Sequence, residues 1–331
     1  MAQLTVIMPV YNGENYLEEA VDSILNQTFT DFILLVLNDN STDNTKSILD
    51  TYSEKDKRLK VIHKTQNEGP ANLRNEGISL ANTPYIALMD ADDIALPTRF
   101  EKQLDVLKNN TNIGVCGTWF TIFGDKKEKT IKHAITHEAL KVQFLNSCGI
   151  GNPTVMFKAS AVEDLKFEHQ YVPAEDYGFW SEAIKTTEFY NIPEALLRYR
   201  WHPNNISQTK EENLRKAEVS IKKKQLESFG VDDDVIHMES FLNAVSLKRK
   251  LSPDAIISTI EASKKLRMRN AKINYYNQGV FEAHINRTIV RTIRNASSYN
   301  LEFFKYLKNK SGYFNQIPIL DKIIIFLKSL F

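Results

Sequence analysis

The feature that most constrains the fold of this 331-residue chain is a set of four short apolar runs before residue 90. They occupy residues 4–10, 32–37, 59–63 and 84–89. The first, second and fourth resemble buried strands, and the third is also predicted as a strand. Segments with helical spacing separate them, as at residues 17–25, where Leu17, Ala20, Val21, Ile24 and Leu25 share one face. This alternation predicts an α/β fold with a mostly parallel sheet flanked by helices.

Further elements are predicted beyond residue 90. Helical spacing is found at residues 97–107, 137–145 and 173–184, strand-like runs at 113–123 and 195–202, and a basic loop at 126–132.

In the helix predicted at residues 71–81, we expect four residues to face inward: Leu73, Gly77, Ile78 and Leu80.

The character of the sequence changes at about residue 207. Beyond it glycines become rare, amphipathic helical stretches become long, and lysine and arginine predominate. We therefore predict an α/β domain at residues 1–206 and a helical C-terminal region at residues 207–331. This region has three candidate roles: shaping an acceptor site, forming an oligomer, or docking on a membrane.

Residues 318–331 predict a helix with a wide apolar face beside Lys322 and Lys328, too short for the roughly 20 residues of a membrane span. Two interpretations are open: a helix docked on the protein's own core, and an interfacial helix resting on anionic lipid. Because an apolar strand follows the first three residues without a basic stretch or cleavage site, no signal peptide is predicted. The protein is expected in the cytoplasm or at the inner face of the cell membrane.

The overall charge argues against one class of partner. Lys and Arg total 42 against 41 Asp and Glu, and a net charge of +1 gives no general attraction for nucleic acid. Cys116 and Cys148 form no metal-binding or disulfide pattern and are expected to be free thiols.

Three carboxylates, Asp90, Asp92 and Asp93, directly follow the run at residues 84–89. Acids this close raise one another's pKa, and a bound divalent cation relieves their repulsion. Their oxygens suit Mg²⁺ or Mn²⁺, and ligands of open α/β sheets bind at the carboxyl ends of strands. The sequence therefore predicts a metal site here, with an acidic surface turn as the alternative.

A nucleotide diphosphate sugar is a ligand that would use such a site. Asp39, after the second run, could accept the N3–H of a uracil or merely cap a helix. Arg74 could pair with the diphosphate or a base carbonyl, or form an ion pair with Glu76 or an acid at the sheet end. Asp92 would hold the metal, and Asp90 would reach the ribose or the surroundings of the metal.

Three residues nearer the middle of the chain complete the predicted site. Arg200 and His202 alternate on one face of a strand, which favours a shared anionic partner, and His202 is a candidate to close over the metal. Asp176 lies at a helix start beside Glu175 and is the candidate base for an acceptor hydroxyl. The alternative for Asp176 is a helix-terminal acid without chemistry.

Seven motifs now stand in order over roughly the first 200 residues. They are TVIMPVYN at residues 5–12, ILNQTF at 24–29, NDNSTD at 38–43, NEG at 67–69 with Arg74, Asn75 and Gly77, MDADD at 89–93, Glu175-Asp176, and YRWH at 199–202. In this set and order the chain resembles family 2 glycosyltransferases of the GT-A fold. The resemblance implies inverting sugar transfer from a nucleotide diphosphate sugar with Mn²⁺ or Mg²⁺ as cofactor.

The resemblance also implies roles for the matching positions. Together with Arg200, the nucleotide-binding set would be Pro9, Tyr11, Asp39, Asn67, Arg74, Asp90, Ala91 and Asp92. Asp92 and His202 would hold the metal, and Asp176 would be the catalytic base.

Two departures refine the expected activity. Family members that polymerise carry Gln-x-x-Arg-Trp on a helix and several membrane spans, whereas Arg200-Trp201 stands in a strand context here and no span is predicted. We therefore expect a non-processive enzyme, and the resemblance implies a bacterial-type hexosyl- or N-acetylhexosaminyltransferase. Its acceptor would be a glycan or lipid-linked glycan precursor of the cell surface, such as a capsule or lipopolysaccharide precursor.

UDP is the favoured carrier because Asp39 suits a pyrimidine N3–H, which leaves dTDP open. One alternative is a sugar-phosphate nucleotidyltransferase, which should carry a basic phosphate loop where the acidic Tyr11-Asn12-Gly13-Glu14 stands. Another is a protein that binds a sugar nucleotide without catalysis.

Overall fold

The computed structural model describes residues 2–203, 205, 211–230, 240, 242 and 250–330. They belong to two compact units, Met1–Leu140 with Cys148–Glu218, and Lys141–Ser147 with Val219–Phe331. The boundary predicted between residues 206 and 207 lies outside the described residues, as does Phe331 at the end of the predicted terminal helix. The predicted domain limits therefore stay a prediction.

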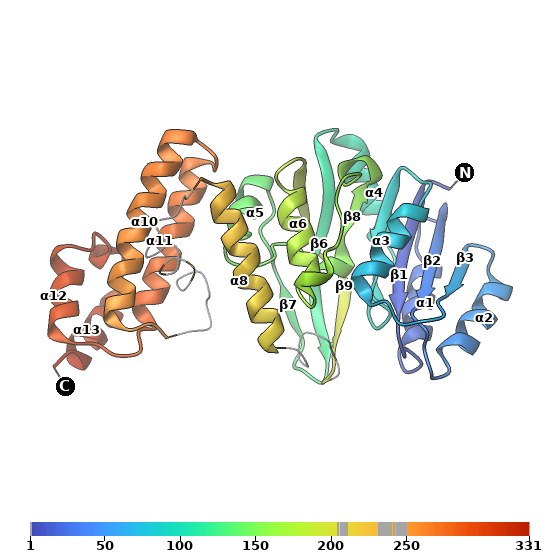
Figure 1. Ribbon diagram of the computed structural model, residues 1–331, viewed down its shortest axis with the longest axis horizontal. Coiled ribbons are helices and arrows are strands. Elements are labelled where there is room, and N and C mark those ends of the chain that lie inside the picture. The colour runs from blue at the N-terminus through green and yellow to red at the C-terminus, as the bar shows by residue number, and fades with distance from the viewer. Residues whose placement is uncertain are drawn as a thin grey trace. The chain divides into compact units, whose positions relative to one another are not determined.

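The first unit is built on a nine-stranded sheet whose first half is parallel (Figure 1). β1 (Leu4–Val10) pairs in parallel with β2 (Phe32–Asn38) and β4 (Tyr85–Leu88), and β2 pairs in parallel with β3 (Leu59–His63). These strands match the four predicted runs to within one residue at each end, so the α/β prediction is confirmed. Parallel pairing brings the carboxyl ends of all four strands to one edge of the sheet.

The second half of the sheet is mixed. β8 (Met156–Lys158) is antiparallel to β4 and to β6 (Ile113–Gly124), β6 is parallel to β9 (Glu188–Trp201), and β5 (Ile94–Ala95) is antiparallel to β9. The order is β3-β2-β1-β4-β8-β6-β9-β5, and β7 (Lys129–Ile131) pairs with β6.

Two expectations for this half are corrected. β9 begins at Glu188 rather than at residue 195, because Pro193, which interrupts the strand pattern, falls at a shift in the β6–β9 register. A shift of this kind tolerates the missing N–H donor of proline. β7 occupies part of the expected basic loop, because residues 129–131 find pairing partners on β6.

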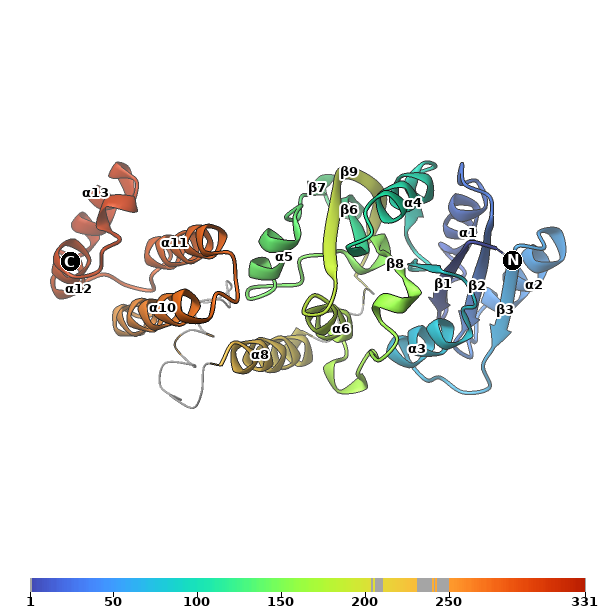
Figure 2. The same cartoon turned by 90° about the horizontal axis from the view of Figure 1, so that it is seen from above.

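Helices cover both faces of the sheet (Figure 2). On one face lie α1 (Leu17–Leu25) and α4 (Arg99–Asn109), and on the other lies α3 (Pro70–Leu80). The other helices before residue 200 are α2 (Thr45–Lys55), α5 (His137–Gln143) and α6 (Glu175–Ala183). Short 3₁₀ turns lie at Asn152–Thr154, Ala159–Ala161 and His169–Tyr171.

The buried face of α3 differs from the prediction at its end. Leu73 and Gly77 are buried as expected, and a Cβ at position 77 would lie 2.6 Å from Ile7 Cγ2, so helix and β1 are in close contact there. Leu80 is 46% exposed, and the expectation that it faces inward is wrong. It is the last residue of the helix and lies beyond this close contact, while Arg74 is buried instead.

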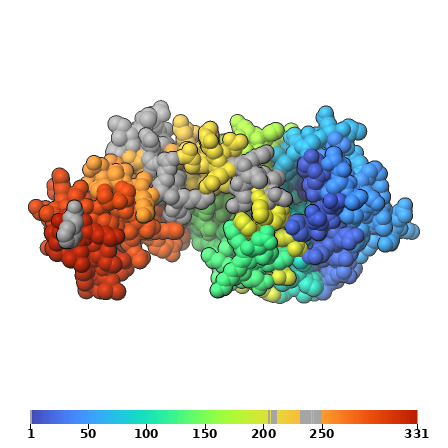
Figure 3. Space-filling model, turned by 90° about the horizontal axis from the view of Figure 1, so that it is seen from below, coloured from blue at the N-terminus to red at the C-terminus, as the bar shows by residue number. Residues whose placement is uncertain are grey.

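The C-terminal region is helical, as predicted. In the part that the structure describes, its helices are α8 (Glu211–Ser228), α10 (Pro253–Ile273), α11 (Gln278–Arg294), α12 (Leu301–Asn309) and α13 (Ile319–Lys328), with a 3₁₀ turn at Phe314–Gln316. Ser252, Asn277 and Asn300 cap α10, α11 and α12 by accepting a backbone N–H. Figure 3 shows the red residues of α12 and α13 at the surface of this unit. No described helix is long and apolar enough to cross a membrane.

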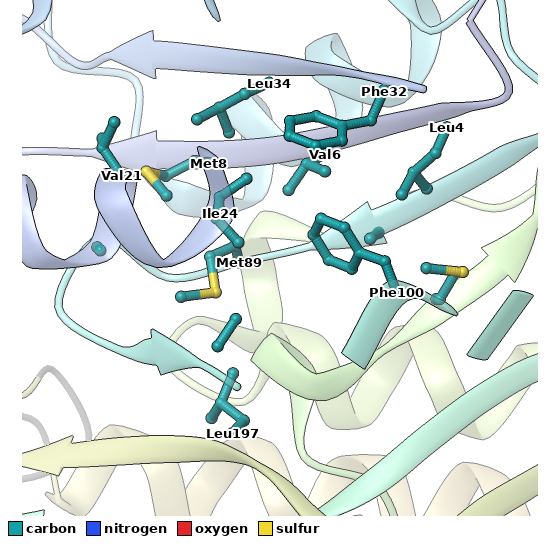
Figure 4. Close-up of a cluster of buried hydrophobic side chains, with 14 of the residues drawn as sticks. Leu4, Val6, Met8, Val21, Ile24, Phe32, Leu34, Met89, Phe100 and Leu197 are labelled. Carbon is teal, nitrogen blue, oxygen red and sulfur yellow. The ribbon is translucent and has the colours of Figure 1, made fainter. Parts of the chain in front are cut away.

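Each unit has its own hydrophobic core. Figure 4 shows part of the first, in which Leu4, Val6 and Met8 of β1 meet α1 and α4. The rings of Phe32 and Phe100 pack edge to face there, with centroids 5.7 Å apart. The second core joins apolar residues of α10, α11, α12 and α13. The sheet of the first unit is therefore stabilised by a hydrophobic core of its own.

Two leucines of α3 give a matched test of this packing. Leu73→Ala should lower the free energy of unfolding by about 2–5 kcal/mol, because it leaves a cavity in a packed position. Leu80→Ala should cost less than about 0.5 kcal/mol, because the side chain is exposed. Urea unfolding followed by circular dichroism measures both, and equal losses would contradict the assignment of the buried face.

Candidate active site

A cavity of ≈ 750 Å³ opens at the carboxyl ends of β1, β2 and β4. This is the sheet edge at which α/β folds bind ligands, and the volume suits a small-molecule site. The predicted residues on its wall are Pro9, Tyr11, Asp39, Arg74, Asp90, Ala91, Asp92, Asp176 and His202. The wall formed by the described residues does not include Asn67 or Arg200.

Asp92 and His202 meet directly. His202 Nε2 lies 3.1 Å from Asp92 Oδ2, although 110 residues separate them in the chain. The ring of Tyr16 stacks on the imidazole, with centroids 5.2 Å apart. Burial, and then the charge of Asp90, raises the pKa of Asp92, while His202 opposes that rise. The sequence-predicted pair is therefore brought together at the cavity wall.

Arg200 holds the acidic loop from outside the cavity. Its Nε donates to the carbonyl oxygen of Asp92 at 2.8 Å, and its Nη2 bonds Glu19 at 2.6 Å. Its backbone N–H donates to Asp93 Oδ1 at 2.8 Å. Arg200 and His202 thus both contact Asp92, but Arg200 does so at the neutral carbonyl oxygen, so the carboxylate of Asp92 is not an anionic partner that the two share. Because the guanidinium has these partners and does not line the cavity, its predicted contact with the nucleotide finds no support in this geometry.

Arg74 bridges two acids. Its Nη2 lies 3.0 Å from Asp90 Oδ1 and its Nη1 lies 2.7 Å from Glu175 Oε1. Among the described residues, Arg74 Nε and Glu175 Oε2 have no hydrogen-bond partner. Of the two ion pairs considered from the sequence, the one with a sheet-end acid is present, while Glu76 pairs with Lys64 at 2.8 Å. Arg74 therefore connects the acids after β4 to the start of α6.

Asp176 stands beside this bridge on the cavity wall, at the start of α6. Burial, together with the charge of Glu175, raises the pKa of Asp176 to about 7, although Arg74 opposes the shift. Its Oδ1 accepts the backbone N–H of Tyr177 at 2.7 Å. A carboxyl group with this pKa can take up and release a proton near neutral pH, as a general base must.

Asp39 organises the loop before α3. It is buried, and its carboxylate accepts the backbone N–H groups of Glu68 at 2.7 Å and Gly69 at 2.9 Å. Gly69 has φ +81°, a conformation that favours glycine. Asn67 donates to the carbonyl oxygen of Asp39 at 3.3 Å and so supports the loop from outside the cavity. A carboxylate offers about four acceptor positions, so these two bonds leave room for a base N–H.

Two residues beneath the site are fully buried: Asp93, the last acid of the predicted cluster, and Arg99, which has no role in the sequence prediction. Asp93 is fully buried, and burial, then Asp92, raises its pKa well above the ordinary range. Arg99 is also fully buried, and its Nη2 donates to the carbonyl oxygen of Leu88 at the end of β4 at 2.9 Å. The sequence carries one signal for Arg99, because it stands four residues before Gln103, beside the apolar stripe of α4.

The donor set suits a divalent ion that shares its coordination with a ligand. Among the described residues, no group of three or more His, Cys, Asp or Glu could hold a metal alone. Mg²⁺ is commonly held through one or two carboxylates plus substrate phosphates, and imidazole is a further ligand for first-row metals. Asp92 and His202 would hold such an ion, with phosphate oxygens completing its shell.

Comparison with known proteins identifies the family. The model of glycosyl transferase family 2 matches residues 5–165. A relative named an uncharacterized glycosyltransferase, from Haemophilus influenzae, is 34% identical over 255 residues, covering 72% of this chain and 79% of the relative. The chain belongs to glycosyltransferase family 2. This glycosyltransferase is also 28% identical over 215 residues to the UDP-Glc:alpha-D-GlcNAc-diphosphoundecaprenol beta-1,3-glucosyltransferase WfgD of Escherichia coli, covering 64% of this chain and 83% of that enzyme.

Solved structures share the fold of this glycosyltransferase. S. aureus TarS 1-349 in complex with UDP-GlcNAc aligns with a TM-score of 0.59 at 19% identity, over 88% of this chain and 90% of the TarS 1-349 chain. The mannosyltransferase PcManGT from Pyrobaculum calidifontis, in complex with GDP-Man and Mn²⁺, aligns with a TM-score of 0.53 at 17% identity, over 88% and 87%. These similarities confirm the predicted GT-A fold.

The raised pKa of Asp176 predicts a pH-dependent effect on stability. Its pKa in the folded protein, about 7, exceeds the ordinary aspartate value of 3.8, so the stabilisation from proton binding is complete below about pH 4 and is lost as pH rises through 7. Asp176→Asn mimics the protonated acid and cannot lose this stabilisation. The melting temperature of the variant relative to the parent should therefore rise between pH 4 and pH 8. A difference that does not change with pH would contradict the raised pKa.

Proposed function

We propose that this glycosyltransferase moves one sugar, with inversion, from a UDP-sugar to a hydroxyl of a cell-surface glycan precursor. The observation that carries the proposal is that the Asp92–His202 pair and Asp176 lie on the wall of one cavity. The pair supplies ligands for a metal on the donor diphosphate, and Asp176 supplies a base. Binding and proton transfer thus have separate residues within one site.

The charge of the cavity supports a metal-dependent donor. Among the described wall residues, five acids, Asp39, Asp90, Asp92, Glu175 and Asp176, stand against one arginine, Arg74. A diphosphate brought into such a site would be repelled unless a cation came with it. Bound Mn²⁺ or Mg²⁺ would offset the charge that builds on the departing nucleoside diphosphate.

Asp176 would act as the base in a direct displacement at the anomeric carbon. In the proposed step the acceptor hydroxyl oxygen forms a bond to the anomeric carbon, and the bond from that carbon to the diphosphate oxygen breaks. The hydroxyl proton passes to Asp176, and the nucleoside diphosphate leaves with the bonding electrons. Direct attack from the face opposite the leaving group inverts the anomeric configuration.

The donor and acceptor classes rest on chemistry and on relatives. Asp39 retains acceptor positions for a pyrimidine N3–H, and TarS has been solved with UDP-GlcNAc. PcManGT, solved with GDP-Man, makes GDP the main alternative carrier. The E. coli relative acts on a GlcNAc-diphosphoundecaprenol acceptor, so we propose a lipid-linked glycan acceptor at the inner face of the membrane.

Asp176→Asn tests the assignment of the base. Transfer should fall by a factor of at least about 100, the typical contribution of general base catalysis, while the Kd for UDP with Mn²⁺ stays within about twofold. Asp31→Asn, at an exposed acid away from the cavity, is the matched control and should leave both unchanged. Turnover is measured by UDP release with an acceptor mixture and binding by calorimetry. Full turnover in Asp176→Asn would exclude it as the base.

Asp92→Asn tests the cation. With Mn²⁺ present, the variant should bind UDP about tenfold or more weakly than the parent, because the phosphate loses its bridge to the protein. In excess chelator, the parent and the variant should bind UDP almost equally, and transfer by the parent should stop. Activity that survives the chelator would contradict metal dependence.

A further inference from the structure

The C-terminal helix α13 presents an apolar surface. Ile319 and Leu320 are 73% and 70% exposed. Five further apolar residues of this segment are each at least 41% exposed: Ile323, Ile324, Phe326, Leu327 and Leu330. Of the apolar residues of α13, Ile325 alone is buried. Of the two interpretations open from the sequence, a helix buried on its own core does not describe this side of α13.

The exposed residues form one continuous face. At 100° per residue, the exposed apolar positions of residues 319–330 span roughly 160° of the helix circumference. Lys322 and Lys328 fall at about 40° beyond the two borders of this arc. Ile325, on the opposite side, belongs to the core of the unit, and Figure 2 shows α13 beside α12. The helix thus has one packed side and one apolar side bordered by cations.

The charge of the C-terminal part of the chain favours one kind of partner for this face. Residues 250–330, all of them described, contain 14 Lys and Arg against 5 Asp and Glu. The only acid of α13, Asp321, is paired with Arg294 at 2.8 Å. A partner for this face should therefore be apolar within and anionic at its surface, which describes a bilayer containing anionic lipid.

We propose that α13 lies flat in the headgroup region of an anionic membrane, with its apolar arc among the acyl chains and Lys322 and Lys328 at the phosphate level. The proposal extends the proposed function, because a lipid-linked acceptor would have to be met at a bilayer. The apolar arc itself is independent of that function.

A second copy of the chain fits this face less well. Two copies would bring together two regions that each carry an excess of positive charge, which opposes association. The arc consists of Ile, Leu and Phe and lacks the Trp, Tyr and Arg side chains that dominate protein interfaces. Dimerisation through this face would be detected as a change of oligomeric state in Ile323→Glu.

The test is flotation with vesicles in the absence of nucleotide. The parent should bind vesicles of phosphatidylglycerol and phosphatidylethanolamine, and bind pure phosphatidylcholine vesicles at least tenfold more weakly. Ile323→Glu should weaken binding to the anionic vesicles by at least tenfold, because it places a charge in the arc. Lys322→Gln with Lys328→Gln should weaken it by about 30-fold, since each lysine contributes about 1 kcal/mol.

Met268→Glu is the matched control. Met268 is 66% exposed on α10, outside α13, and the substitution makes the same change of charge as Ile323→Glu. It should change vesicle binding by less than about threefold, and circular dichroism should report the parent's helix content in every variant. Absence of binding by the parent, or equal loss in both glutamate variants, would overturn the proposal.

A parent that is dimeric at micromolar concentration and becomes monomeric in Ile323→Glu would assign the face to a second copy instead and would also overturn the proposal. UDP binding, measured separately by calorimetry, should be the same in the parent and in Ile323→Glu. Loss of vesicle binding with retained UDP binding would thus affect this proposal alone, whereas failure of UDP binding in the parent would affect the proposed function alone.

Discussion

The site depends on charge compensation where β4 leaves the sheet. Asp90, Asp92 and Asp93 lie within four consecutive residues just after the strand, and repulsion among them would disfavour the turn unless cations lay close by. Arg74 contacts Asp90 from the cavity side, and Arg99 bonds the last residue of β4 from below. The acidic turn is therefore held by buried guanidinium groups from two helices on opposite faces of the sheet.

The arginines do not neutralise all of the acids after β4, and the remaining negative charge is suited to binding a cation. Asp93 is buried with a raised pKa, which favours its neutral form and reduces the repulsion within the turn. The carboxylate of Asp92 contacts His202 and lines the cavity. The acids that remain on the wall favour a divalent cation. Burial, together with the charge of Glu175, raises the pKa of Asp176 to about 7, into the range of a base.

Much of the fold follows from local sequence patterns. β1, β2 and β4 are almost entirely buried, so their apolar runs are continuous, and the helices between the strands show clear spacing. β3 lies at the edge of the sheet, where only Leu59 is buried and Lys60 is exposed. The start of β9 was predicted too late because Pro193 interrupts the strand pattern of the sequence. In the structure Pro193 falls at a shift in the pairing of β9 with β6, where the missing N–H of proline is tolerated. The burial of Leu80 was predicted wrongly because helical spacing does not show where the contact between the helix and the sheet ends.

The site was predictable to a similar degree. Asp92 and His202 were both marked by their motifs, and their contact at 3.1 Å depends on the pairing of β5 with β9, which local patterns do not reveal. Arg200 carried the same kind of signal, but its side chain turns to Glu19 and the backbone of Asp92. Arg99 was missed because arginine is rarely fully buried, and only tertiary structure shows the carbonyl groups that accept its bonds.

The central claim is that a divalent cation joins Asp92 to the diphosphate of a sugar donor. The most direct measurement is a crystal structure with UDP and Mn²⁺, in which anomalous scattering at the manganese edge locates the ion. The account predicts an anomalous peak within bonding distance of the Asp92 carboxylate and of both phosphates, with the base next to Asp39. A nucleotide bound away from β4, or a manganese peak with no contact to Asp92, would contradict it.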